Sequence, residues 1–399
     1  MADNKDKKVL NVPHLRFPEF SGEWNKYTIN DLATVVGGGT PDTTVKSYWG
    51  GDIQWFTPSE IGKNKYVDFS KRTITRDGLD NSSAKLLPLH TILLSSRATV
   101  GECSIASNEC TTNQGFQSLI AKQCNIDFLY YLIQTKKKDL IRNACGSTFL
   151  EISANEIRKI KVAVPVQNEQ EQIAKLLSLI DERIATQNKI IYKLKSLIKG
   201  LVDELMTVLL KGKLYPFSSF YIKAGEGGTP TTSVVEYYTE GTIPFIKIED
   251  LSCKYLTNNK DFITELGMQK SSAWLIPSKS VIYSNGATIG AISINEYPVC
   301  TKQGILGIVP NTNINVEYLY LLMSSSYFSK EISRIITEGT MKTAYLKDIN
   351  HIKCPLPSMA QQKNITNLTS SIEEKLSIEQ ELLRFLNLQK QYLLHMIFI

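Results

Sequence analysis

Two stretches of the chain, about 190 residues apart, carry hydrogen-bonding side chains in the same order. They contain Ser95, Ser96, Arg97 and Thr99 in the first stretch, and Ser284, Asn285 and Thr288 in the second. Arginine donates to guanine edges, asparagine pairs with adenine, and hydroxyl groups also grip phosphate. Different residues at one matched position predict two loops that contact different bases. The alternative is a strand end and turn in which Arg97 is solvated or paired with an acid.

A second pair of matched loops follows. Asn113 and Gln114 of the first half match Lys302 and Gln303 of the second. Glutamine recurs while its neighbour changes from an amide to a cation. The recurrent glutamine therefore either holds the loop or reads a base.

Basic side chains form a third group, suited to phosphate contact. They are Lys63, Lys65, Lys71, Arg72 and Arg76 in the first half, and Lys247, Lys254 and Lys260 in the second. A solvated surface explains them equally well. Ser147 and Thr340 complete the candidates, because each lies in a small-residue loop that would let the backbone approach closely.

The chain lacks the motifs by which comparable enzymes work. It has no GxxxxGK[ST] phosphate loop and no Pro-Pro dipeptide, which excludes the Asn/Asp-Pro-Pro-aromatic motif of amino-methyltransferases. In the forty residues after Asp42, no Asp or Glu is followed two residues later by Lys, as a nuclease motif requires. The run Gly37–Gly39 leads into Thr-Pro and predicts a tight turn, not a phosphate cradle. We therefore expect no catalytic residues.

Composition narrows the class of protein further. The four histidines are not spaced as metal ligands, and the seven cysteines include no CxxC pair, so we expect no metal site and reduced thiols. No stretch approaches 18 apolar residues, and the N-terminus lacks a signal-peptide pattern, which predicts a soluble cytoplasmic protein. The net charge of +6 is slight, so weak DNA binding by the isolated chain is expected.

The second half of the chain repeats the first. Gly38-Gly39-Thr40-Pro41 recurs as Gly227-Gly228-Thr229-Pro230, and Ser82-Ser83-Ala84 recurs as Ser271-Ser272-Ala273. Thr112-Asn113-Gln114-Gly115 matches Thr301-Lys302-Gln303-Gly304. Because the period far exceeds the 20 to 50 residues of a solenoid unit, it indicates a duplicated domain. Short runs such as 91–94 and 280–283 predict strands, and single helices are expected near 126–143 and 316–336.

A long helix follows each repeat. The predicted heptad seam of the first contains Ile173, Leu177, Ile180, Ile184, Ile191, Leu194, Ile198 and Leu201, with Gln187 as its polar member. The second seam contains Ile365, Ile372, Leu376, Leu383, Leu386 and Leu393, with Glu379 at the position equivalent to Gln187. These steps of three and four indicate a coiled coil. Gln187 and Glu379 either fix its register or face solvent where the seam loosens.

The predicted fold is α+β: two mixed, strand-rich domains separated by a pair of long antiparallel coiled-coil helices, with a pseudo-two-fold internal repeat. The boundaries are 1–165 and 213–357 for the domains, 166–212 for the central helix and 358–399 for the C-terminal helix. Such a chain resembles a dimer in one polypeptide, with the helices setting the spacing between two readers.

The duplicated GGTP module, a proline and a helix that opens Glu169-Gln170 with Ile173 resemble the specificity subunit of type I restriction-modification systems. The second copy keeps this mark only as Gln361-Gln362 and Ile365, which affects helix contacts alone. The resemblance implies two target-recognition domains that each read half of a bipartite double-stranded DNA sequence. It also implies partners: two adenine-N6 methyltransferase subunits and restriction subunits. S-adenosylmethionine, Mg and ATP would belong to those subunits, and this chain would bind no cofactor.

Two other functions compete with this interpretation. A coiled-coil scaffold whose globular blocks bind peptides or sugars would show no salt-dependent DNA binding. A self-sufficient nuclease-methylase would need the methyltransferase motifs that the sequence lacks.

Overall fold

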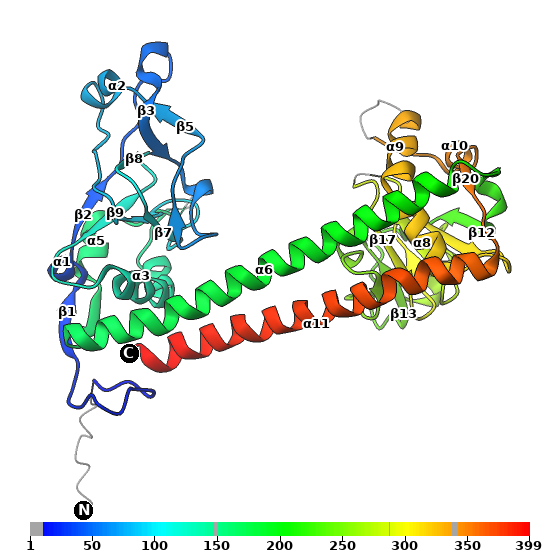
Figure 1. The fold of residues 1–399 in the computed structure, drawn as a ribbon. Helices are drawn as coiled ribbons and strands as arrows, with labels where there is room; N and C mark the ends of the chain where they lie inside the picture. The colour runs from blue at the N-terminus through cyan, green and yellow to red at the C-terminus, as the bar shows by residue number, and fades with distance from the viewer. Residues whose placement is uncertain (1–10, 147–149, 287, 337–341) are drawn as a thin grey trace, which may run out of the picture. The chain divides into compact units, whose positions relative to one another are not determined.

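The computed structural model describes residues 11–146, 150–286, 288–336 and 342–399, which form two units (Figure 1). Unit 1 comprises residues 1–188 and 382–399, and unit 2 comprises residues 189–381. The long helices α6 (Gln167–Leu209) and α11 (Met359–Ile397) contribute to both. The boundary between the two units therefore falls within each long helix. Each unit consists of a strand-rich block and one segment of each helix.

Unit 1 contains three sheets. The five-stranded sheet has the order β2-β9-β6-β7-β4, with β2 (Ala33–Gly37), β9 (Gln117–Ala121), β6 (Ile92–Leu94), β7 (Cys103–Ala106) and β4 (Tyr66–Val67). The three-stranded sheet has the order β5-β3-β8, with β5 (Arg72–Ile74), β3 (Trp49–Phe56) and β8 (Cys110–Thr112). β1 (Asn25–Thr28) pairs with β10 (Lys161–Val164) and closes the block before α6 begins.

Unit 2 repeats this topology strand for strand. Its five-stranded sheet has the order β12-β19-β16-β17-β14, with β12 (Tyr221–Glu226), β19 (Ile305–Pro310), β16 (Val281–Ser284), β17 (Ile292–Asn295) and β14 (Tyr255–Leu256). The three-stranded sheet is β15 (Asp261–Ile263), β13 (Ile243–Ile246) and β18 (Cys300–Thr301), and β11 (Leu214–Pro216) pairs with β20 (Lys353–Pro355). The mixed, duplicated fold predicted from the sequence is confirmed.

All of the short helices except α1 occur in equivalent pairs. In unit 1 they are α1 (Ile29–Leu32), α2 (Arg76–Asp80), α3 (Ile126–Thr135), α4 (Lys137–Arg142) and α5 (Ala154–Lys159). In unit 2 they are α7 (Glu265–Gln269), α8 (Val316–Ser324), α9 (Ser326–Ile335) and α10 (Leu346–Ile349). The expectation of one helix near 126–143 and one near 316–336 is wrong, since each is broken in two. At the second break, Ser325 has an extended backbone and accepts a hydrogen bond from Phe328 N, which starts a new helix.

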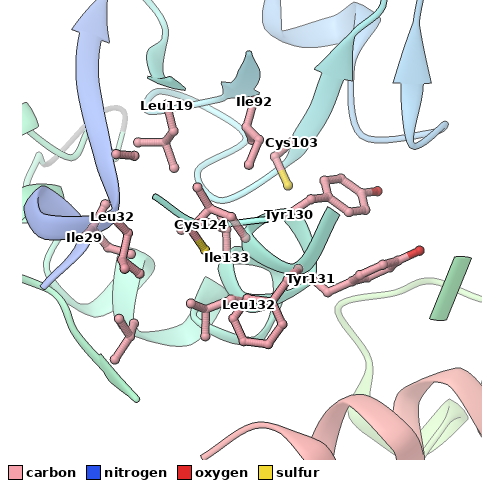
Figure 2. Packing of buried hydrophobic residues seen from close by; sticks show 14 of the residues in the cluster. Ile29, Leu32, Ile92, Cys103, Leu119, Cys124, Tyr130, Tyr131, Leu132 and Ile133 are labelled. Atoms are coloured by element: carbon pink, nitrogen blue, oxygen red, sulfur yellow. The ribbon is translucent and has the colours of Figure 1, made fainter. Parts of the chain in front are cut away.

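Helix α3 supplies the centre of the unit 1 core. Tyr130, Tyr131, Leu132 and Ile133 are almost wholly buried, and Figure 2 shows these side chains gathered with Ile92 and other residues of the five-stranded sheet. In unit 2 the equivalent α8 is buried among Val281, Leu306 and Ile308 of its own sheet. In each block, therefore, one apolar helix covers the five-stranded sheet.

A recurrent glutamine ties each block to its long helix. Gln170 donates to the carbonyl oxygen of Pro165 at 2.9 Å and accepts from the backbone N–H of Asn125 at 3.0 Å. Gln362 donates to the carbonyl of Pro357 at 2.9 Å and accepts from the N–H of Asn315 at 2.7 Å. We call these two residues the anchor glutamines. They satisfy buried or part-buried backbone groups just before α3 or α8 and just before the long helix, which accounts for their recurrence.

The residue before each anchor glutamine differs in role. Glu169 is buried and forms a bidentate pair with Arg16, at 2.8 Å and 2.7 Å, and also accepts from Trp24 Nε1 at 3.2 Å. Gln361 is exposed and accepts from the N–H of Ser358 at 3.0 Å. The departure in the second sequence copy is therefore larger than a change in helix contacts, because Glu169 holds the N-terminal segment of unit 1 whereas Gln361 only caps its own helix.

The long helices pack on each other within unit 1 in antiparallel fashion. Ile173, near the start of α6, shares a hollow with Ile397 at the end of α11, and Asp181 pairs with Lys390 at 2.7 Å. In unit 2, Val202 and Met206 of α6 share a core with Ile365 of α11.

The seam positions predicted from the sequence have low exposure. Buried are Ile173, Leu177, Ile180, Ile191, Ile365 and Leu386, while Ile184, Leu194, Ile198, Leu201, Ile372, Leu376, Leu383 and Leu393 are half-buried. Near the end of α6, the buried residues are Val202 and Met206, which do not occupy the predicted heptad positions. Gln187 and Glu379 are buried too, and the interpretation that they face solvent is wrong.

Candidate nucleic-acid interface

The repeated motifs of unit 1 meet at residues 38–41, which leave β2 without the tight turn predicted for Gly37–Gly39, and the chain turns only at residues 43–44. We call residues 38–44 the GGTP turn. A Cβ on Gly38 would lie 2.0 Å from the carbonyl oxygen of Asn113, and one on Gly39 would lie 2.3 Å from Ala84 N. Only glycine permits so close an approach of backbones. The turn is thus a packing point between segments 82–84 and 112–115.

The same packing point exists in unit 2. A Cβ on Gly227 would lie 2.1 Å from the carbonyl oxygen of Thr301, and one on Gly228 would lie 2.4 Å from Ala273 N. Motifs that the sequence repeats in fixed order are therefore segments that touch.

The GGTP turn of unit 1 also positions polar and aromatic side chains. Thr40 Oγ1 donates to Gln114 Oε1, so this glutamine helps to hold the loop through its side-chain oxygen. Trp55 Nε1 donates to the carbonyl oxygen of Gly39 at 2.9 Å, and Trp49 Nε1 donates to that of Asp42 at 3.1 Å. In unit 2 the glutamine loop is held differently, since the N–H of Gln303 donates to Thr229 Oγ1 at 3.4 Å.

A shallow hollow beside the turn brings two predicted loops of unit 1 together. Its volume is about 230 Å³, and its lining is Pro58, Arg97, Ala98, Asn113, Gln114 and Gly115. Arg97 is half-exposed and lies 3.8 Å from the Glu151 carboxylate. Ala98 has a φ of 62°, in the left-handed region, which is energetically unfavourable for any residue that has a Cβ atom. The hollow offers a guanidinium and two amides to a ligand.

The prediction that four of the candidate residues contact bases is wrong, because their side chains point into the block. Ser95, Ser96, Ser284 and Asn285 are each no more than 1% exposed. They lie at the ends of β6 and β16, where the chain crosses the core before the turn. Asn285 Nδ2 donates to the carbonyl oxygen of Ala344 at 3.1 Å, so it bonds within the block. These side chains support the loops and do not reach base edges.

Thr99 and Thr288 are exposed. Thr99 Oγ1 lies 3.0 Å from Ser95 Oγ, across the turn that carries Arg97. Ser147 and Thr340 lie outside the described residues.

Lys65 and Lys254 were predicted to contact phosphate, but both are largely buried and form ion pairs at equivalent positions in the two units. Lys65 Nζ lies 2.8 Å from Asp127 and donates to Ser178 Oγ at 2.6 Å, with its side chain 10% exposed. Lys254 Nζ pairs with Glu373 and lies 3.5 Å from Glu317, with its side chain 13% exposed. Each lysine thus joins a block to its long helix, since Ser178 and Glu373 belong to α6 and α11.

The remaining basic candidates are accessible, but several are neutralised. Arg76 lies 3.7 Å from Asp80, and Lys247 lies 2.8 Å from Asp261, whose hydrogen bond raises the pKa of Lys247. Lys63, Lys71, Arg72 and Lys302 are exposed. Arg72 differs from the others, because its guanidinium carbon lies over an aromatic ring, 3.6 Å from the centre of Trp49.

The sequence did not reveal the roles of Trp49 and Phe69. Trp49 belongs to an aromatic pair, Tyr48-Trp49, that recurs as Tyr237-Tyr238, and this recurrence was the only available signal. Phe69 has a side chain 79% exposed in the segment before Arg72, and nothing in its local sequence marks it.

A sequence profile described as "Type I restriction modification DNA specificity domain" matches residues 21–196 and again 220–387. These two matches cover most of the chain. The chain belongs to this family. Its duplicated blocks and long helices are the two copies of the family's domain.

Similar proteins agree with this assignment. The chain is 29% identical over 382 residues to the type I restriction enzyme MjaIX specificity subunit of Methanocaldococcus jannaschii, covering 89% of this chain and 88% of that one. The crystal structure of the type I restriction-modification S subunit from M. genitalium has a TM-score of 0.54 at 18% identity, covering 97% and 99% of the chains. A chain from a study of complex assembly in the type I system has a TM-score of 0.58 at 13% identity, covering 93% and 96%. At such identities the two structures show the common fold.

Two further observations concern the described residues. They include no group of three or more His, Cys, Asp or Glu side chains placed to hold a metal ion. None of their helices is long and apolar enough to span a membrane.

Proposed function

We propose that the chain is the sequence-recognition subunit of a type I restriction-modification complex. Each unit reads one half of a bipartite double-stranded DNA target, and α6 and α11 set the spacing of the halves. The observation that carries this proposal is the duplicated family domain, whose two copies share internal contacts and differ at exposed positions.

The exposed positions around the GGTP turns suit direct readout. In unit 1 they present Arg97, Asn113 and Gln114 around one hollow. In unit 2 the corresponding positions are Gly286, Lys302 and Gln303. Guanidinium and amide groups read base edges, whereas a lone lysine also serves phosphate. Two half-sites of different sequence follow from these differences.

The outer face of α11 supports a role for the helices in binding methyltransferase subunits. Leu382, Phe385, Leu388 and Tyr392 are 41%, 54%, 50% and 58% exposed. Their spacing of three or four residues places them along one side of the helix, where Leu382 lies one turn before the buried Leu386 at the edge of the stripe. An apolar stripe of this kind fits a partner helix.

Catalysis belongs to other chains in this proposal. Two methyltransferase subunits transfer the methyl group to adenine N6, and restriction subunits add ATP-dependent cleavage. S-adenosylmethionine, Mg and ATP are bound by those subunits, and this chain contributes the choice of site.

Adenine-methylation mapping tests the proposal. Genomic DNA from cells that carry this gene and its methyltransferase partner is sequenced by a single-molecule method, beside DNA from cells in which only this gene is deleted. We expect a split motif that disappears on deletion. An unchanged methylome in cells that express the complete system would contradict the proposal and favour the scaffold alternative.

A further inference from the structure

Arg72 is held on an aromatic platform in unit 1. Its Cζ lies 3.6 Å from the centre of the Trp49 ring and 5.5 Å from that of Trp55. The two indoles meet edge to face, at 5.0 Å and 90°, and both donate to carbonyl oxygens of the segment that starts with the GGTP turn. A guanidinium stacked in this way is fixed in orientation before any ligand arrives.

Among the described residues, no carboxylate lies within ion-pair distance of the Arg72 guanidinium, whereas Arg76, Arg97 and Arg142 each have one. The stacking leaves the N–H groups of Arg72 at the surface, where its side chain is exposed. Its hydrogen-bonding capacity is therefore directed outward.

The segment that leads into Arg72, the first residue of β5, is held by hydrogen bonds. Ser70 accepts from Trp55 N at 2.9 Å and donates to the carbonyl oxygen of Arg72 at 2.6 Å, while Gln54 Oε1 accepts from Ser70 N at 2.7 Å. Phe69 projects from this segment with 79% of its side chain exposed. A segment held in this way, which exposes an aromatic and a cation, is arranged for contact with a ligand.

Unit 2 does not share this arrangement. Pairing registers place Arg72 opposite Trp55, and place Asp261 opposite Phe245. Asp261 is therefore the counterpart of Arg72, and it is paired with Lys247 at 2.8 Å. An unpaired guanidinium in one unit stands where the other has a neutralised carboxylate, so the scaffold does not require a cation there.

We propose that Arg72 is a specificity-determining residue that reads a guanine in the half-site bound by unit 1. This inference rests on the proposed function. The guanidinium donates two parallel hydrogen bonds to O6 and N7 of the guanine, a contact for which its planar fork is suited. Unit 2 makes no equivalent contact, because its Asp261 is held by Lys247.

The test uses the assembled methyltransferase complex with wild-type chain, Arg72→Lys and Arg72→Ala. Methylation rates are measured on DNA duplexes in which each base pair of the mapped motif is changed in turn. With both variants we expect discrimination at one G·C pair of one half-site to fall about 10- to 100-fold. The half-site read by unit 2 should keep its selectivity, which also shows that the complex is folded. Arg142→Ala, an exposed arginine paired with Asp139 on α4, is the matched control.

Arg72→Lys separates readout from phosphate contact, since lysine keeps the charge and loses the fork. Wild-type selectivity in Arg72→Lys, or a uniform loss of rate with an unchanged motif in Arg72→Ala, would overturn the inference alone. A wild-type complex without any split motif would overturn the proposed function first.

Discussion

The anchor glutamines make the same bonds in the two units, whereas the residues around the GGTP turns do not match. Gln170 and Gln362 each bridge a proline carbonyl and the N–H group that precedes a core helix. Arg72, Arg97 and Asn113 of unit 1 are replaced by Asp261, Gly286 and Lys302 in unit 2. Duplication has kept the contacts that hold a block to its helix.

The difference shows which residues belong to the scaffold. Lys65 and Lys254 occupy equivalent positions, are largely buried and pair with acids in both units. Their recurrence therefore reflects a structural role. Under the proposed function, exposed residues that change between the units are expected to lie on the DNA-reading surface. Unit 2 is thus a control for unit 1 within a single chain.

The largest difference in stability is expected at Glu169 and its counterpart Gln361. Glu169→Ala leaves Arg16 without its carboxylate in a site where that side chain is 14% exposed, at a cost of about 3 kcal/mol. Gln361→Ala removes only an exposed cap and should cost less than about 1 kcal/mol. Urea titration followed by circular dichroism measures both. Equal midpoint shifts for the two variants would contradict the separate roles.

The anchor glutamines should instead behave alike. Gln170→Ala and Gln362→Ala each leave a buried N–H and carbonyl without a partner, which costs about 2 kcal/mol in each unit. The same titration applies, and calorimetry shows whether one or two transitions move. A large shift for one variant with none for the other would break the proposed equivalence.

Salt dependence sharpens the comparison between Asn113 and Lys302. Lys302→Ala should lower the slope of log K against log salt by about 1, because one phosphate contact is lost. Asn113→Ala should leave the slope unchanged, since it removes no charge. Fluorescence anisotropy of a labelled duplex bound by the assembled complex supplies the slopes. Identical slopes for Lys302→Ala and wild type would exclude a phosphate contact by this lysine.

The smallest expected effect concerns the reactivity of buried and exposed cysteine thiols. Burial raises the pKa of Cys103, Cys110, Cys124 and Cys354 to about 12 and that of Cys300 to about 11, so these thiols stay protonated at pH 8. Cys145 and Cys253 are exposed, one in each unit. We expect two thiols per chain to react with a disulfide reagent at pH 8 before unfolding and seven afterwards. Rapid reaction of a third thiol in the folded chain would contradict the burial described.

Much of the fold could be predicted because its signals are local. The repeated GGTP, SSA and glutamine-glycine motifs, the strand runs and the helix seams are patterns of spacing. The site was harder, because exposure depends on distant contacts. Lys63 and Lys65 are both lysines of one loop, yet only Lys65 docks on α3 and α6. No sequence pattern distinguishes them.

The stacking of Arg72 on Trp49 could not be predicted from the sequence for the same reason. Trp49 is 23 positions away in the sequence, and the two residues meet only because β3 and β5 pair in one register. Ser95 and Asn285 were misplaced for a related reason. Their polar side chains suggested a surface loop, but the backbone bonds at the ends of β6 and β16 draw them inside.

The most direct test of the central claim replaces residues 213–357 with a second copy of residues 21–165 and maps adenine methylation in cells that express this chain with its methyltransferase. If each unit reads its own half-site, the new motif will contain the first half-site twice, in inverted orientation, and the original second half will be absent. Persistence of the original motif, in a complex shown to assemble, would contradict the account of two independent readers.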